Sequence, residues 1–122
     1  MGELRKYDLE DRLVKFAIMI VEVCDLLPNS KACNNLEYQL SKSGTAPALM
    51  YGEVQAAESR ADFIHKMKIL LKELRETRIS LRIINEKPLV QHEKVAITLK
   101  ECNELIGIFT KSVETAKKNQ VV

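Results

Sequence analysis

The sequence predicts an all-α protein with the architecture of an up-down antiparallel four-helix bundle. Two observations predict this fold: four long segments repeat apolar residues every three or four positions, and short polar or proline-containing segments separate them. The composition agrees, because 46% of the residues are apolar, 30% are charged, and the 122 residues include only four glycines and three prolines. We expect one domain, residues 1–122, in which no strand pattern interrupts the helices.

The first helix is expected over about residues 8–27, because Asp8 is suited to cap its N-terminus and Pro28 stops it. Its apolar residues form two stripes that lie roughly 140° apart around the helix. In a bundle of four helices one stripe faces the core, so the other needs a further helix or a second subunit to cover it. This second stripe consists of Val14, Ile18 and Val21.

The second helix is expected over about residues 30–57, with a break at residues 43–45. Gly44 supplies a permissive backbone for the break, and Thr45 is able to cap a helix that restarts there. Pro47 suits an early position of the restarted helix. The alanines and the glycine that follow are small, and we expect them to let a neighbouring backbone approach closely.

The third and fourth helices are expected over about residues 59–85 and 88–118. Ser59 and Asp62 have the spacing of a capping box at the start of the third helix. Both helices then carry an apolar seam in which steps of four and three residues alternate for about three heptads. Two such seams joined by a short loop are typical of an antiparallel bundle.

Four short motifs occur in order along the chain: Ser43-Gly44-Thr45, Tyr51-Gly52-Glu53, the segment from Ser59 to Ile64, and Lys72-Glu73 with Glu76-Thr77. This ordered set resembles the bacterial four-helix-bundle family named after intervening sequences in large-subunit ribosomal RNA genes. The resemblance implies a four-helix bundle that assembles into a ring, commonly a homopentamer, and most members have no known activity. A group related to this family, the accessory proteins of diversity-generating retroelements, uses a similar basic pentamer to bind a reverse transcriptase and nucleic acid.

A basic stripe on the third helix is the clearest surface feature of the sequence. Its members lie within about 80° of one another at helical spacing, so a ring of subunits would repeat them as a band able to contact phosphates. The alternative is a solvated face that pairs with neighbouring acidic residues on the same helix. No aromatic residue interleaves with these charges, which argues against stacking on single-stranded bases. The stripe consists of Lys68, Lys72, Arg75 and Arg82.

The sequence contains no residue pattern that predicts an enzyme, a metal site or a cofactor site. Asp62 and His65 have the three-residue spacing of one acid–histidine pair, but a carboxylate-bridged metal site in a helix bundle needs two such pairs. His92 supplies no second pair, because the residue three positions before it is not acidic. The three cysteines are far apart and form no Cys-x-x-Cys motif, which favours buried thiols in a reducing cytoplasm. The charged N-terminus and the short apolar runs predict neither a signal peptide nor a membrane span.

The sequence therefore predicts a non-enzymatic, cytoplasmic scaffold or adaptor whose first partner is itself, as a homo-oligomer and most simply a pentamer. We expect the subunit contacts at Val14, Ile18, Val21 and Tyr51, together with the small residues between Ala46 and Ala57. The alternative is an accessory protein that binds RNA or DNA through the basic stripe, alongside a partner protein.

Overall fold

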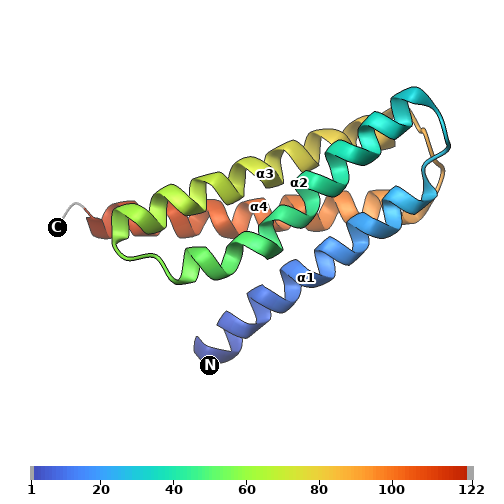
Figure 1. The fold of residues 1–122 in the computed structure, drawn as a ribbon. Helices are drawn as coiled ribbons and strands as arrows, with labels where there is room; N and C mark the ends of the chain where they lie inside the picture. The colour runs from blue at the N-terminus through green and yellow to red at the C-terminus, as the bar shows by residue number, and fades with distance from the viewer. Residues whose placement is uncertain (1, 121–122) are drawn as a thin grey trace.

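A computed structural model describes the backbone of residues 2–120 and the side chains of residues 9–119. Four long helices run alternately up and down the molecule, and no strand occurs within the described backbone (Figure 1). Each helix packs against its neighbours in the chain, and the first also contacts the last. The all-α four-helix bundle is therefore confirmed. Its helices are α1 (Gly2–Leu26), α2 (Lys31–Gln55), α3 (Arg60–Glu86) and α4 (Glu93–Gln120).

The core is built from one apolar stripe of each helix, as the spacing of the apolar residues predicts. Phe16 of α1, Leu40 of α2, Leu74 of α3 and Phe109 of α4 have almost no exposed surface. Burying side chains of this size contributes roughly 1.5–3 kcal/mol each to folding. The two expected seams on α3 and α4 line this core, and only Phe63 and Leu99 among their members are partly exposed.

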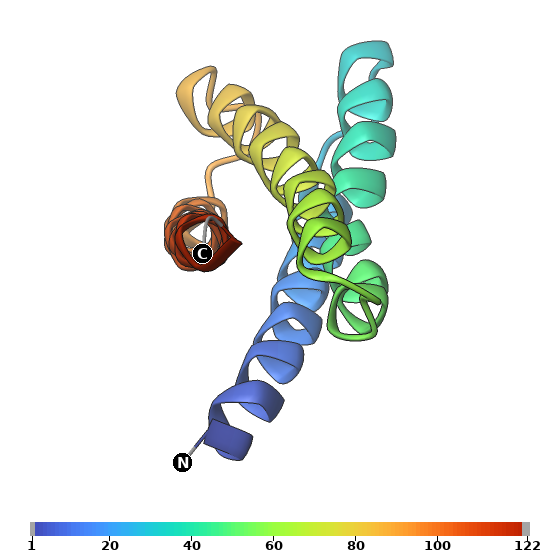
Figure 2. The same cartoon turned by 90° about the vertical axis from the view of Figure 1, so that its left-hand side faces the viewer.

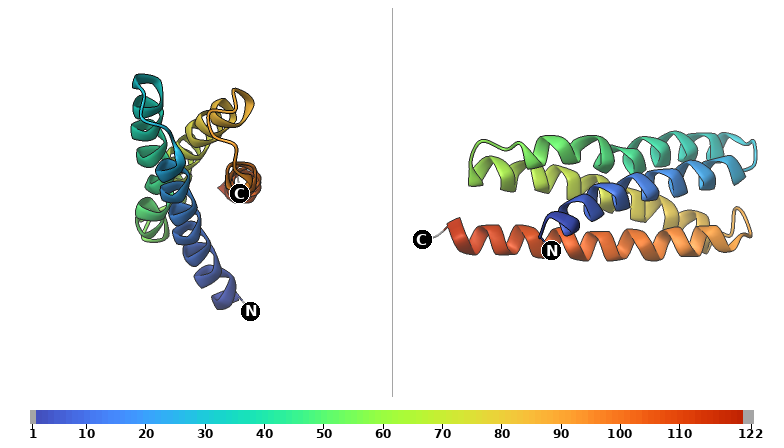
Figure 3. Two further views of the ribbon diagram at one scale, coloured as in Figure 1. Left: turned by 90° about the vertical axis from the view of Figure 1, so that its right-hand side faces the viewer. Right: turned by 90° about the horizontal axis from the view of Figure 1, so that it is seen from below.

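The helix α1 diverges from α4 toward its N-terminus, as the end-on view in Figure 2 shows. Three ion pairs among the described side chains join the helices where they are close: Arg12 binds Glu101 at 2.7 Å and Glu104 at 3.3 Å, and Lys94 binds Glu22 at 2.8 Å. The view from below in Figure 3 shows that α4 continues past the start of α1. The C-terminal part of α4 therefore lacks the neighbour that covers its first half.

The break that the sequence predicts at residues 43–45 does not occur, because α2 is one continuous helix. The φ angle of Gly44 is not positive, so the chain makes no left-handed turn there. Thr45 lies inside the helix, and its hydroxyl donates a hydrogen bond to the Ser41 carbonyl oxygen at 2.7 Å. Pro47 also lies inside the helix, where its missing N–H removes one backbone hydrogen bond without ending the helix.

The residues at the expected break, 43–45, lie where α2 packs against its neighbouring helices. Gly44 faces α1 so closely that a Cβ atom at residue 44 would lie 2.6 Å from Ile20 Cγ1. On the other side, the buried hydroxyl oxygens of Ser43 and Thr77 lie 2.9 Å apart and are hydrogen-bonded between α2 and α3. Small and hydroxyl-bearing residues are needed here because two neighbouring helices approach α2 at the same level.

The remaining helix ends differ from the prediction in two places. The helix α1 begins at Gly2, so Asp8 lies inside it, and α4 begins at Glu93 instead of residue 88. His92 explains the later start of α4, since its Nδ1 accepts a hydrogen bond from the Lys94 backbone N–H at 3.0 Å. The side chain of Ser59 caps α3 as expected, and that of Ser30 caps α2.

Candidate interaction surfaces

The second apolar stripe of α1 lies on the outside of the bundle. Val14, Ile18 and Val21 are 45%, 53% and 48% exposed, although all three are β-branched apolar residues. The buried face of the same helix, including Phe16, points the other way, as the angular separation of the two stripes requires. Single exposed apolar side chains are ordinary, but three in helical register form a continuous strip.

Two further apolar residues are exposed on α2. Tyr38 is 64% exposed and Leu49 is 79% exposed, both directly opposite the buried face of α2. Contacts between α1 and α2 set their register: Gly44 meets Ile20, and the Cys24 thiol donates to the Glu37 carbonyl oxygen at 3.8 Å. Because α1 and α2 are antiparallel and rise by the same distance per residue, this register places Leu49 and Val14 at the same height along the bundle axis. We call the set of Val14, Ile18, Val21, Tyr38 and Leu49 the α1/α2 outer face.

Sequence reasoning missed Tyr38 and Leu49 because of the expected break. Residues 38, 42, 45 and 49 follow steps of four, three and four, which is the spacing of one helical face. If a new helix began at Thr45, the spacing between Tyr38 and Leu49 would not show that they share a helical face. Because α2 is continuous, the two residues share one face.

Tyr51 was expected among the subunit contacts, but it lies inside the protomer. Its residue is 6% exposed, and its ring packs edge-to-face against Phe109 with 6.1 Å between the ring centroids. Burial, with a smaller contribution from the charge of Glu10, raises the pKa of the Tyr51 hydroxyl. Tyr51 therefore stabilises the packing of α2 against α4 and offers no surface to a second molecule in this conformation.

The structure places all four members of the basic stripe on the outside of α3. Two of them have acidic neighbours one turn away: Lys72 lies 3.7 Å from Glu76, and Arg82 lies 2.7 Å from Glu86. These pairs are exposed, so they neutralise charge only weakly. Among the described side chains, Lys68 and Arg75 form no ion pair. Acidic residues of the same helix therefore pair with two of the four members, whereas phosphate contact stays a prediction.

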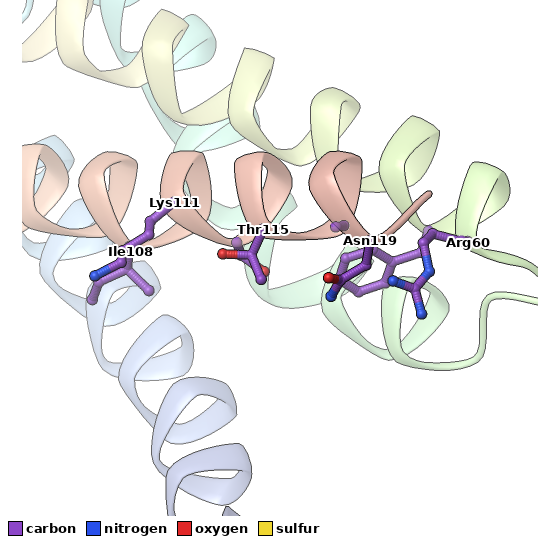
Figure 4. A pocket seen from close by; sticks show the side chains of 8 residues that line it. Arg60, Ile108, Lys111, Thr115 and Asn119 are labelled. Carbon is purple, nitrogen blue, oxygen red and sulfur yellow. The ribbon is translucent and has the colours of Figure 1, made fainter. Parts of the chain in front are cut away.

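A hollow of about 730 Å³ lies where the start of α3 meets the C-terminal half of α4. Phe63, Ala116 and Ile108 contribute apolar surface to it. Figure 4 shows Ile108, Lys111, Thr115 and Asn119 on one side of α4, with Arg60 of α3 beyond Asn119. We call this hollow the α3/α4 groove; nothing in the sequence pattern predicted it, because it exists only where α1 diverges.

The remaining candidates for chemistry are separated or buried. Cys24, Cys33 and Cys102 are free and buried. Burial raises the pKa of Cys24 to about 11 and that of Cys102 to about 12, so both thiols stay protonated near neutral pH. Within the described residues, no three His, Cys, Asp or Glu side chains gather closely enough to hold a metal ion. None of the helices, over the residues described, is long and apolar enough to cross a membrane.

Comparison with known proteins identifies the family. A family model described as 23S rRNA-intervening sequence protein matches residues 5–111, which span all but the ends of the chain. The chain belongs to the 23S rRNA-intervening sequence protein family. The match includes every motif on which the resemblance was based.

A solved structure supports the membership of the chain in the 23S rRNA-intervening sequence protein family. The chain is 27% identical to a Bacteroides thetaiotaomicron VPI-5482 protein, described as a protein with unknown function from the S23 ribosomal protein family. The two structures superpose with a TM-score of 0.78, and the match covers 89% of this chain and 97% of the other. No curated protein matches the chain.

Proposed function

We propose that this protein is a non-enzymatic helical scaffold that works as a homo-oligomer, with five subunits in a ring. The observation that carries the proposal is the α1/α2 outer face, where Val14, Ile18 and Val21 stand about half exposed in one row. Covering an apolar strip of this kind is favourable at about 25 cal/mol per Å² of buried apolar surface. A ring closes when each subunit presents this strip to its neighbour at a fixed rotation.

The proposed setting is the cytoplasm, where the assembly binds a partner protein. Three buried free thiols suit a reducing compartment. The number of subunits and the binding of a partner protein are proposed from the family resemblance. The contact surface between subunits is proposed from the exposed apolar side chains.

The native mass in solution tests the assembly. We expect light scattering behind a sizing column to give about five times the chain mass of 13.9 kDa. Ile18→Glu should reduce this mass to that of one chain, because an isolated charge in an apolar contact is strongly unfavourable. Ile97→Glu on α4 is the matched control, since Ile97 is also 53% exposed. A monomeric wild-type protein, or an equal effect of both substitutions, contradicts the proposal.

A second function, nucleic-acid binding, is favoured by the two unpaired cations of the α3 basic stripe. Lys68 and Arg75 stand free on the outer side of α3 among the described side chains, and a ring would repeat them in every subunit. We expect affinity for a fluorescent single-stranded RNA or DNA to fall steeply between 50 and about 200 mM salt. The double variant Lys68→Glu/Arg75→Glu should abolish binding.

The control for this test is a charge change of the same size elsewhere. Lys100→Glu/Lys117→Glu on α4 alters the net charge equally but leaves the α3 basic stripe intact. If both double variants weaken binding alike, or if binding does not depend on salt, the stripe is a solvated face and not a nucleic-acid site.

A further inference from the structure

The α3/α4 groove is the position of a missing neighbour of α4. Near its start, α4 is covered by α1 through the ion pairs of Lys94 and Glu101. The same side of α4 continues at helical spacing through residues 108, 112, 115 and 119, all of which line the groove. From the level of Arg12, α1 has only ten more described residues, about 15 Å of helix, and it diverges over that length (Figure 3).

The lining of the groove combines an apolar floor with two cations and no acidic residue. Phe63 of α3 is partly exposed in the groove, which small side chains of α4 also line. Arg60 and Lys111 stand at the two ends of the groove (Figure 4), and neither forms an ion pair with a described side chain. An apolar floor between two free cations fits a ligand that is apolar on one side and negatively charged at its margins.

The distance between the cations defines the ligand further. Arg60 lies beside the Asn119 end, and Lys111 is eight residues earlier on α4, or about 12 Å along the helix. Two helical turns of a bound helix span the same distance, so acidic residues seven or eight positions apart would reach both cations. Ser112, Thr115 and Ala116 are small enough to let a helix approach α4 closely.

We propose that the α3/α4 groove binds an amphipathic helix of a partner protein, in the position that α1 leaves empty. The helix places apolar residues at steps of three and four against Phe63 and Ile108, and acidic residues two turns apart against Arg60 and Lys111. This inference does not rest on the proposed ring, whose contact surface is on α1 and α2. It supplies the adaptor with a defined site for its partner.

Two designed 18-residue peptides test the groove directly. Both carry leucines on one helical face; one carries glutamates at the margins seven residues apart, and the other carries lysines at the same positions. We expect fluorescence anisotropy to show at least tenfold tighter binding of the glutamate peptide to the full-length protein. The variant Arg60→Glu/Lys111→Glu should reverse this preference, and it should fold normally because a glutamate is favourable in the first turn of α3.

Two controls separate the groove from general electrostatics and from the ring. Lys42→Glu/Lys100→Glu makes the same change in net charge outside the groove and should leave the preference unchanged. Ile108→Ser should weaken binding of the glutamate peptide at least fivefold while circular dichroism stays native. Equal binding of both peptides, no binding, or an unchanged preference in Arg60→Glu/Lys111→Glu overturns the proposal. A change of native mass in the groove variants would instead assign the groove to a second copy of the chain, and also overturns it.

Discussion

Gly44 of α2 lies so close to Ile20 of α1 that the two helices leave no room for a methyl group between them. A Cβ atom at residue 44 would lie 2.6, 2.7 and 2.9 Å from the Cγ1, Cγ2 and Cδ1 atoms of Ile20. Ile20 is fully buried, and its two γ carbons are fixed to a branched Cβ, so the side chain has little freedom to move aside. The closest approach of α1 and α2 therefore depends on a glycine.

Gly44→Ala should destabilise the protein even though alanine is the better helix former. The helical gain is about 0.5–1 kcal/mol, whereas overpacking of a tight core contact typically costs about 1–3 kcal/mol. We expect a net loss of free energy of unfolding, measured by urea denaturation at fixed protein concentration. Gly107→Ala on α4 is the control: apart from the backbone of its own helix, no described atom lies within 4 Å of a Cβ there, so it should stabilise the protein. Equal stabilisation by both substitutions would show that the contact with Ile20 is unimportant.

The buried hydroxyl pair between α2 and α3 should behave as a unit. Thr77→Val keeps the shape of the side chain but leaves the buried Ser43 hydroxyl without its partner at 2.9 Å. We expect a loss of about 1–3 kcal/mol in the free energy of unfolding, because an unpaired buried hydroxyl carries its full desolvation cost. Adding Ser43→Ala should recover most of this loss. If the two single effects simply add in the double variant, the hydrogen bond does not couple the helices.

The bidentate ion pair between Arg12 and Glu101 should hold α1 against α4. Arg12 Nε and Nη2 lie 2.7 and 2.9 Å from the two carboxylate oxygens of Glu101, and both side chains are largely shielded from water. Glu101→Gln should lower the free energy of unfolding by about 1 kcal/mol and increase hydrogen exchange in α1. Asp11→Asn is the control, because the Asp11–Lys15 pair is exposed on α1 and should contribute less than about 0.5 kcal/mol. Unchanged exchange in Glu101→Gln would contradict this role.

The buried thiols should make stability fall at alkaline pH. Burial raises the folded pKa of Cys24 to about 11 and that of Cys102 to about 12, from an ordinary value of 9.0. The thiols' contribution to stability is therefore complete below pH 9 and declines as pH rises toward 11–12, because the unfolded thiols ionise first. Urea denaturation at pH 8 and 10 under reducing conditions measures the decline. Cys24→Ala/Cys102→Ala should decline less over the same interval; an identical slope would exclude this cause.

Much of the fold follows from local pattern. The period of the apolar residues in residues 59–85 predicts a helix with a buried seam, and Leu70, Leu74 and Leu81 are fully buried there. Ser30 and Ser59 act as caps because a side-chain oxygen satisfies a free backbone N–H, which requires only neighbouring residues. The outward position of Val14, Ile18 and Val21 follows from the same period, since one helix cannot turn two opposite stripes to one core.

The roles of residues that contact another helix could not be predicted from the local sequence pattern. Gly44 has the local chemistry of a helix break, but its close contact with Ile20 exists only when α1 and α2 pack together. The local sequence around Tyr51 fits a surface position and a core position equally well. Tyr51 is in the core because its ring packs against Phe109, which lies far along the chain. In the same way, the α3/α4 groove depends on the angle at which α1 leaves α4, which no single helix encodes. The sequence by itself determined which residues form helices and which faces are apolar, because those depend on neighbours three or four positions apart. Only the tertiary structure decided how closely the helices approach and where α4 is left uncovered, because these depend on the packing of segments distant in the chain.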